Sequence, residues 1–308
     1  MNQTALLLLG FCSKFTQRYR RALLNRCNSS PHFRRFRLFP NWFTDKFMQQ
    51  SFFIKVLVIS LLPFSFVAEK KGKPVLYIIG DSTVKNGDGT GKNNQMGWGT
   101  VIDVYFDTLK ISVRNHAIGG RSSRTFISDG RWNTILAALK KDDYVIMQFG
   151  HNDGGALDDT ARARGTIKGI GEDSVEIYNP IKKMKEMVHT YGWYMRKYVN
   201  EAKAKGATAI ICSPIPRNDW KDGNVVRSNQ SYALWAKQVA EQTSAYFIDL
   251  NEIVALQYEK MDTAKVSSFF PADHTHTNKE GAELNAELVV KEIEQLKGIK
   301  LKKYLVHK

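Results

Sequence analysis

Short apolar runs alternate with longer amphipathic stretches from residue 75 to residue 295, and this alternation is the feature that most constrains the fold. The apolar runs are five or six residues long and rich in β-branched side chains, which is typical of strands buried on both faces. We expect strands at Val75–Ile79, Ile111–Asn115, Tyr144–Phe149, Ala207–Cys212 and Tyr246–Leu250. We expect helices at Trp98–Leu109, Trp132–Leu139, Gly192–Ala204, Gln230–Thr243 and Lys279–Gln295. Strands and helices that alternate in this way form a parallel sheet covered on both faces, so the sequence predicts an α/β fold.

The residues before this pattern have a different character. Residues 48–68 combine one lysine, Lys55, with an apolar core at Val56–Leu62 and a small residue at Ala68, which is the order of a secretory signal peptide. The run from Ser51 to Ala68 has 18 residues and contains Lys55 and Pro63, which is marginal for a transmembrane helix and favours a signal peptide over an anchor. We therefore expect a secreted or periplasmic protein that keeps no stable membrane span after the signal is removed.

A signal peptide lies at the N-terminus of its protein, so we expect translation to start at Met48. Residues 1–47 are then a gene-model extension or a disordered basic leader. The alternative is a genuine cytoplasmic tail in front of a signal anchor. Residues 69–308 have the length of one α/β domain, and we expect them to form a single one.

The leader carries most of the excess positive charge. The whole chain has a net charge of +15, but residues 1–68 hold ten Lys and Arg and one acidic residue, which leaves the domain at +6. That charge is compatible with an acidic substrate. No recognisable nucleic-acid-binding module is present, so we expect no nucleic-acid partner. The oligomeric state is left open. Cys212 is the one cysteine of the domain, which excludes a disulfide or a cysteine zinc site within it.

Four polar motifs lie at the expected strand ends or in loops beside them, at Gly80–Ser82, Ile118–Arg121, Gly150–Asp153 and Asp273–His276. The carboxyl ends of parallel strands share one rim of the sheet, so residues that are distant in sequence can meet there. The polar segment 153–190 also follows a strand end and is long for a loop. We expect it to form a wall of a cleft at this rim.

These motifs contain the parts that acyl transfer requires. Ser82 follows a buried strand and a sharp turn, so it can act as a nucleophile. His276 can accept its proton, and Asp273, three residues earlier, can hold the imidazole in the required tautomer. The backbone N–H of Gly120 and the side-chain amide of Asn152 can donate to the oxyanion.

Two points leave alternatives open. The His-x-His pair formed by His274 and His276 can bind a metal, so a metal-dependent hydrolase is the rival from another class. We nevertheless prefer His276 as the base, because its spacing from Asp273 suits the orienting contact. Arg121 and Arg124 follow the oxyanion glycine and either contact uronate carboxylates of a substrate or form a salt-bridged structural pair.

Four blocks of sequence together resemble a known superfamily. They are GDSTV at 80–84, NHAIGGRSSRTF at 115–126, YVIMQFGHNDGG at 144–155 and FPADHTHTN at 270–278. They resemble the SGNH/GDSL hydrolases and, more narrowly, the rhamnogalacturonan acetylesterases. The resemblance spans roughly residues 74–298.

The resemblance implies a flavodoxin-like, three-layer α/β/α fold with a parallel sheet of about five strands. It implies a triad of Ser82, Asp273 and His276, an oxyanion hole from Ser82, Gly120 and Asn152, and no metal or organic cofactor. The implied activity is a serine esterase that removes O-acetyl groups from a plant cell-wall polysaccharide or its oligosaccharides, above all rhamnogalacturonan. An esterase for acetylated xylan or other acyl sugars is the alternative within the same chemistry.

Overall fold

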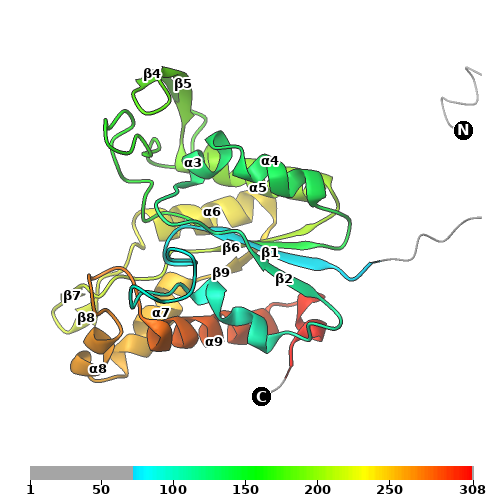
Figure 1. The fold of residues 1–308 in the computed structure, drawn as a ribbon, viewed down its shortest axis with the longest axis vertical. Coiled ribbons are helices and arrows are strands. Elements are labelled where there is room, and N and C mark those ends of the chain that lie inside the picture. Colours follow the sequence, from blue (N-terminus) through cyan, green and yellow to red (C-terminus); the bar gives the residue numbers. More distant parts are fainter. Residues whose placement is uncertain (1–71, 307–308) are drawn as a thin grey trace, which may run out of the picture. The chain divides into compact units, whose positions relative to one another are not determined.

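The computed structural model describes residues 72–306, so the expectations for the signal-like segment 48–68 and for residues 1–47 lie outside the described residues (Figure 1). A parallel sheet of five strands lies at the centre of the domain. Its strands are β1 (Val75–Gly80), β2 (Ser112–Asn115), β3 (Tyr144–Gln148), β6 (Thr208–Cys212) and β9 (Tyr246–Ile248). The expected α/β class is confirmed, and every expected strand is present within two residues at its ends.

Helices cover both faces of this sheet, as the alternating pattern predicts (Figure 1). One face carries α3 (Ser123–Ser128), α4 (Arg131–Ala138), α5 (Tyr191–Ala204) and α6 (Tyr232–Thr243). The other carries α7 (Leu250–Glu259), α8 (Thr263–Ser268), α9 (Lys279–Gln295) and the 3-10 turns η1 (Trp98–Thr100) and η2 (Ile102–Tyr105), with η3 (Leu301–Tyr304) near the end of the chain. Within residues 72–306 no helix has the length and apolarity needed to cross a membrane.

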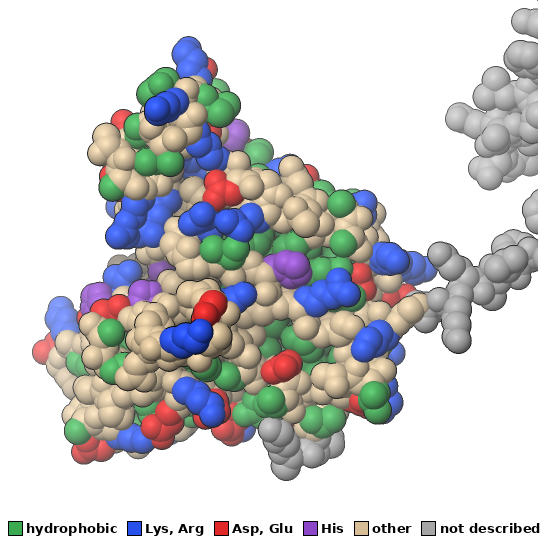
Figure 2. Space-filling view, viewed as in Figure 1, with side chains coloured by type: hydrophobic (Ala, Val, Ile, Leu, Met, Phe, Trp, Pro, Cys, Tyr) green, Lys and Arg blue, Asp and Glu red, His purple; other side chains and the backbone are tan. Residues whose placement is uncertain are grey.

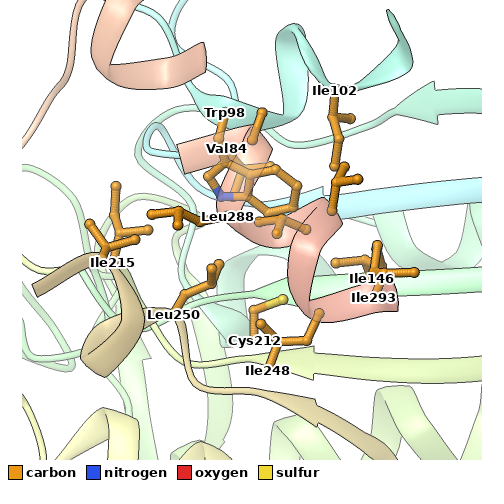
Figure 3. Close-up of a cluster of buried hydrophobic side chains, with 14 of the residues drawn as sticks. Val84, Trp98, Ile102, Ile146, Cys212, Ile215, Ile248, Leu250, Leu288 and Ile293 are labelled. Carbon is orange, nitrogen blue, oxygen red and sulfur yellow. The ribbon is translucent and has the colours of Figure 1, made fainter. Parts of the chain in front are cut away.

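Alternate side chains of the central strands enter two separate cores because successive residues of a strand point to opposite faces. In β1, Ile78 packs on the α9 side and Ile79 on the α5 side. Figure 3 shows part of the α9-side core, where Trp98 and Val84 lie above Leu288. The two buried faces hold the strand ends rigid at the rim where the polar motifs emerge.

The expected helix at Trp98–Leu109 is wrong, since this stretch forms two short 3-10 turns. The Trp98 and Gly99 amides donate to the carbonyls of Thr83 and Val84 at 3.2 and 3.0 Å, outside their own segment. A Cβ at Gly99 would lie 2.7 Å from the Val84 side chain. Contact with the loop after β1 therefore replaces the regular helical ladder.

The segment 153–190 contains a hairpin that the sequence pattern did not predict. Its strands are β4 (Ser174–Asn179) and β5 (Met184–His189), which pair antiparallel. The hairpin projects from the domain beside α3 (Figure 1) and is mostly exposed, so it lacks the apolar alternation of a half-buried strand. A second short hairpin, β7 (Trp220–Lys221) with β8 (Asn224–Val225), lies in the β6–α6 connection.

The strand order is β2-β1-β3-β6-β9, which corresponds to the flavodoxin-like order 2-1-3-4-5 when only the central strands are counted. From β1 the chain adds β2 on one side and then β3, β6 and β9 on the other, so the order of strands reverses between β1 and β3. Gly80 at the end of β1 lies opposite Gln148 at the end of β3. Because ligands of open α/β sheets bind at this switch point, the loops after Gly80 and Gln148 define the candidate site.

Candidate active site

The turn after β1 is held by close backbone packing and one buried carboxylate. A Cβ at Gly80 would lie 2.6 Å from both the Gln148 carbonyl oxygen and the Val84 side chain, so only glycine fits there. The Asp81 carboxylate is fully buried and accepts from the Thr83 amide at 2.9 Å and the Thr83 hydroxyl at 2.7 Å. This turn leaves Ser82 partly exposed at the rim of the sheet.

The structure brings Ser82, His276 and Asp273 together in one line of contacts. His276 Nε2 lies 2.8 Å from Ser82 Oγ, and His276 Nδ1 lies 2.7 Å from Asp273 Oδ2. The other Asp273 oxygen accepts from the amides of Thr275 and His276 at 2.7 and 2.8 Å, which explains how a three-residue spacing closes the contact. With Nδ1 donating to the carboxylate, Nε2 is free to accept the proton of the serine hydroxyl.

The electrostatics of Asp273 favour this arrangement. Burial by itself would raise its pKa, but the hydrogen bonds from the His276 ring and from the His276 and Thr275 amides lower the pKa of Asp273 to about 2. The carboxylate is therefore ionised at neutral pH. An ionised carboxylate fixes the Nδ1–H tautomer of His276 and stabilises the imidazolium that forms when the ring takes a proton.

His274 is not part of this line. Its Nδ1 lies 2.7 Å from Asp219 Oδ1, and its side chain is 53% exposed. His276 is engaged through both ring nitrogens with Ser82 and Asp273. Residues 72–306 contain no group of three or more His, Cys, Asp or Glu side chains arranged to hold a metal ion.

The three expected oxyanion donors face the same cleft as His276. The N–H groups of Ser82 and Gly120 form no hydrogen bond with another described residue. Gly120 has φ of +77°, in the left-handed region that favours glycine. Asn152 donates through Nδ2 to the Arg121 carbonyl at 2.9 Å, which orients the amide and leaves its second N–H available.

Arg164 is a site residue that sequence reasoning missed. Its guanidinium Nη1 donates to the Gly120 carbonyl at 3.2 Å. Arg164 therefore holds the peptide bond that follows Gly120, next to the one that carries the oxyanion-donating N–H. Burial lowers the pKa of Arg164, as does the charge of the neighbouring Arg162. No sequence signal marks it, since it lies in the polar segment 153–190 and meets Gly120 only through tertiary contact.

The expectation that Arg124 contacts substrate is wrong. Its side chain is fully buried, pairs with both carboxylate oxygens of Glu186 and also donates to the carbonyls of Leu157 and Gly165. Arg121 does line the cleft, but its Nε is paired with Asp129 at 2.9 Å. Arg124 therefore forms a structural salt bridge with Glu186. Arg121 lines the cleft, but its charge is paired with Asp129.

His151, in the loop after β3, contacts both the loop after β1 and the loop after β6. Its Nδ1 lies 3.3 Å from Asp81 Oδ2, and its Nε2 lies 3.0 Å from the Ile215 carbonyl oxygen. Both neighbours are hydrogen-bond acceptors, and the imidazole ring bridges them. Burial raises the pKa of Asp81, but the charge and hydrogen bond of His151 and the bonds from Thr83 outweigh it and lower the pKa.

Asp153 joins the end of β3 to the start of α3. Its buried carboxylate accepts from the amide and the hydroxyl of Ser123. Burial raises its pKa to about 7, despite those hydrogen bonds. This carboxylate faces the protein interior and not the cleft, so we assign it to the support of the Asn152 turn.

The cleft above Ser82 has a volume of about 630 Å³ and is strongly basic. Five Lys and Arg side chains and one carboxylate line it, namely Arg121, Arg162, Arg164, Lys182 and Arg217 with Asp129. Figure 2 shows Lys and Arg side chains gathered on the surface beneath the projecting β4–β5 hairpin. The segment 153–190 forms one wall of this cleft, as expected, and the 215–219 loop and the Asp273–His276 loop border the other side.

Comparison with known proteins gives a consistent pattern. The profile of the GDSL-like lipase/acylhydrolase family matches residues 78–284. The chain is 32% identical over 241 residues to a rhamnogalacturonan acetylesterase of Emericella nidulans, covering 78% of this chain and 90% of that one. It is also 32% identical over 227 residues to a probable rhamnogalacturonan acetylesterase, YesY, of Bacillus subtilis, covering 72% and 93% of the two chains.

Two solved structures are similar to the described domain. YxiM of Bacillus subtilis superposes with a TM-score of 0.60 at 27% identity, and the match covers 75% of this chain and 58% of that longer chain. Axe2, an acetylxylan esterase of Geobacillus stearothermophilus, superposes with a TM-score of 0.50 at 20% identity, covering 75% and 97% of the chains. The likeness to Axe2 shows a shared fold.

Proposed function

Because the chain belongs to the GDSL-like lipase/acylhydrolase family and is a carbohydrate acetylesterase, we propose that it removes O-acetyl groups from rhamnogalacturonan through an acetyl-serine intermediate. One observation carries the proposal, namely the chain of contacts from Ser82 through His276 to Asp273 at the floor of a basic cleft. A rhamnogalacturonan acetylesterase and a probable one match most of the domain, and a cleft with five cationic side chains suits a polymer that contains uronate.

In the acylation step, Ser82 Oγ attacks the acetyl carbonyl carbon while His276 Nε2 takes the hydroxyl proton. Negative charge develops on the carbonyl oxygen, where the N–H groups of Ser82 and Gly120 and the Asn152 amide can donate to it. The bond between the carbonyl carbon and the sugar oxygen then breaks. His276 returns its proton to that oxygen, and the sugar leaves with a free hydroxyl.

Deacylation repeats these steps with water. His276 Nε2 removes a proton from a water molecule as its oxygen attacks the acetyl-serine carbonyl. The second tetrahedral intermediate collapses, Ser82 Oγ leaves and regains the proton, and acetate is released. Asp273 stays ionised throughout and stabilises the imidazolium in both halves of the reaction.

Two other functions make different predictions. An esterase for acetylated xylan uses the same residues but has no need for a cationic cleft, so it would show no preference for an acidic polymer. A metal-dependent hydrolase built on His274 and His276 would lose activity to a chelator and regain it with zinc. We expect activity to survive extensive dialysis against a chelator.

The test is acetate release from acetylated rhamnogalacturonan, acetylated homogalacturonan, acetylated xylan and an aryl acetate, measured with wild-type protein and with Ser82→Ala. We expect the highest kcat/KM on rhamnogalacturonan and a loss of roughly 10⁴-fold or more in the variant on every substrate. Circular dichroism of Ser82→Ala provides the folding control. Higher kcat/KM on xylan would overturn the substrate assignment, and substantial turnover by folded Ser82→Ala would overturn the mechanism.

We further propose that the enzyme acts outside the cytoplasm, because a polymer of this size does not cross a membrane and residues 48–68 have the order of a signal peptide. N-terminal sequencing of the protein isolated from its native host should begin near Glu69. Recovery of peptides from residues 1–47 would contradict the proposed start at Met48.

A further inference from the structure

A second cavity adjoins the active-site cleft. It has a volume of about 450 Å³ and lies between the β3–β4 connection and the loop that follows β6. His151 and Arg217 line both this cavity and the cleft above Ser82. The two hollows therefore meet at these side chains, and a polymer whose acetylated sugar lies over Ser82 can continue into the second one.

Arg217 is held at this junction by its neighbours in the chain. Two residues before it, the Ile215 carbonyl oxygen lies 3.0 Å from His151 Nε2. One residue after it, the Asn218 amide donates to the His274 carbonyl at 2.8 Å. Arg217 therefore extends from a short segment that is fixed at one end to His151, in the loop after β3, and at the other end to the loop of the catalytic histidine.

The guanidinium of Arg217 has no partner in the described part of the chain, in contrast to the other arginines nearby. Arg121 pairs with Asp129, and Arg164 donates to the Gly120 carbonyl. Arg227, which lines the second cavity, is paired with two glutamates. An unpaired, half-buried guanidinium between two connected cavities is available for a bidentate contact with a carboxylate.

The rest of the second cavity suits a sugar ring. Pro214, Pro216 and the Tyr232 ring supply apolar surface of the kind on which the C–H face of a pyranose packs. Ser228 lines the cavity, and its hydroxyl oxygen is buried without a hydrogen-bond partner among the described residues. A buried hydroxyl without a partner costs free energy, and a sugar hydroxyl in this cavity would satisfy it.

We propose that the two cavities form one polysaccharide groove, in which the second cavity binds the sugar next to the acetylated one and Arg217 pairs with the carboxylate of a uronate there. This inference rests on the proposed function and assigns the recognition of the acidic sugar to Arg217, in place of Arg121 and Arg124. Arg162 is a second cation of the active-site cleft that has no partner among the described residues, but it is exposed and does not line the second cavity. It therefore provides a matched control with the same loss of charge.

The test compares Arg217→Gln with Arg162→Gln on acetylated rhamnogalacturonan oligosaccharides and on the same oligosaccharides after chemical reduction of their carboxyl groups to alcohols. The measured quantity is the ratio of kcat/KM on the native oligosaccharide to kcat/KM on the reduced one. We expect Arg217→Gln to lower this ratio roughly 10- to 100-fold, mostly through KM, as loss of a charged hydrogen bond implies. Arg162→Gln should lower it much less, since exposed charges are screened.

Arg217→Lys should retain part of the preference, because it keeps the charge and loses the bidentate geometry. Ser228→Ala should weaken binding only of oligosaccharides that extend beyond the acetylated sugar. Equal effects of Arg217→Gln and Arg162→Gln would overturn the subsite and leave only a general electrostatic field. An unchanged ratio in Arg217→Gln would overturn it outright.

The comparison of native with carboxyl-reduced oligosaccharides also tests the wild-type protein without any variant. We expect its KM to be higher for the reduced oligosaccharides. If wild-type protein released acetate from rhamnogalacturonan with no response to reduction, this inference would fail while the proposed function stood. If wild-type protein released no acetate from rhamnogalacturonan, the proposed function would fail first.

Discussion

Replacement of Arg124 by alanine tests whether this arginine stabilises the fold or binds substrate. The side chain is fully buried, and its Nε and Nη2 donate to the two Glu186 oxygens at 2.9 and 2.8 Å. Its Nη1 donates to the carbonyls of Leu157 and Gly165, both at 2.9 Å. One guanidinium thus joins α3 to three points of the segment 153–190, namely Leu157, Gly165 and Glu186 of β5.

The expected cost follows from what the variant leaves behind. Glu186, whose side chain is 14% exposed, would keep only the hydrogen bond from Asn179. Removal of one partner from a buried ion pair typically costs about 3–5 kcal/mol. For a domain of this size each kcal/mol lowers Tm by about 2–4 °C, so we expect Arg124→Ala to lower Tm by roughly 6–20 °C.

The dependence on pH gives a second signature. Burial raises the pKa of Glu186, but the hydrogen bonds and charge of Arg124 and the bond from Asn179 lower it more in the intact protein. Without Arg124, burial would raise the pKa of Glu186. The stability difference between wild type and Arg124→Ala should therefore be largest near neutral pH and shrink as the pH falls and Glu186 takes up a proton.

The assay is urea unfolding of wild type, Arg124→Ala, Glu186→Gln and the double variant, which together form a thermodynamic cycle. We expect a double variant that is less destabilised than the sum of the single ones. Limited proteolysis should show new cleavage within residues 157–189 of Arg124→Ala, because the arginine anchors this segment. A loss below about 1 kcal/mol, together with a selective rise of KM for acidic substrate, would refute the structural assignment and restore Arg124 as a substrate contact.

The remaining predictions concern the catalytic loops. His276→Ala should lose activity as severely as Ser82→Ala, while His274→Ala should lose less, because His274 pairs with Asp219 away from the nucleophile. A larger loss of kcat in His274→Ala than in His276→Ala would reverse the choice of base. Gly120→Ala should lower kcat by up to about 10²-fold, because it displaces an oxyanion donor, and should lower stability by about 1–2 kcal/mol, because alanine is strained at φ of +77°. An unchanged kcat would remove Gly120 from the oxyanion hole. The pKa of Asp273 lies near 2, below its usual value, so its contribution to stability is complete above about pH 4 and is lost towards pH 2. The Tm difference between wild type and Asp273→Asn should shrink over that window, and a difference independent of pH would contradict the contact with His276.

Local patterns in the sequence were sufficient for much of the fold and for the core of the candidate site. The five apolar runs predict the five central strands because burial on both faces demands continuous apolar side chains. Helix α9 has the expected bounds, since its amphipathic period and the Asn278 cap are both encoded within it. Asp273 and His276 meet through one turn of chain, so their spacing alone predicts the contact.

Only the tertiary structure decided the roles of the basic residues. Arg121 and Arg124 follow the oxyanion glycine and look equivalent in sequence, yet one lines the cleft and the other is buried against Glu186, 62 residues further along the chain. Arg164 reaches the Gly120 carbonyl from the segment 153–190, and Arg217 lies between two cavities without a partner among residues 72–306. An arginine has much the same local preferences in each setting, so its role depends on which carboxylates and carbonyls the folded chain brings within reach. Strand and turn preferences act between neighbours in sequence, whereas the pairing of charges is settled only when distant segments pack together.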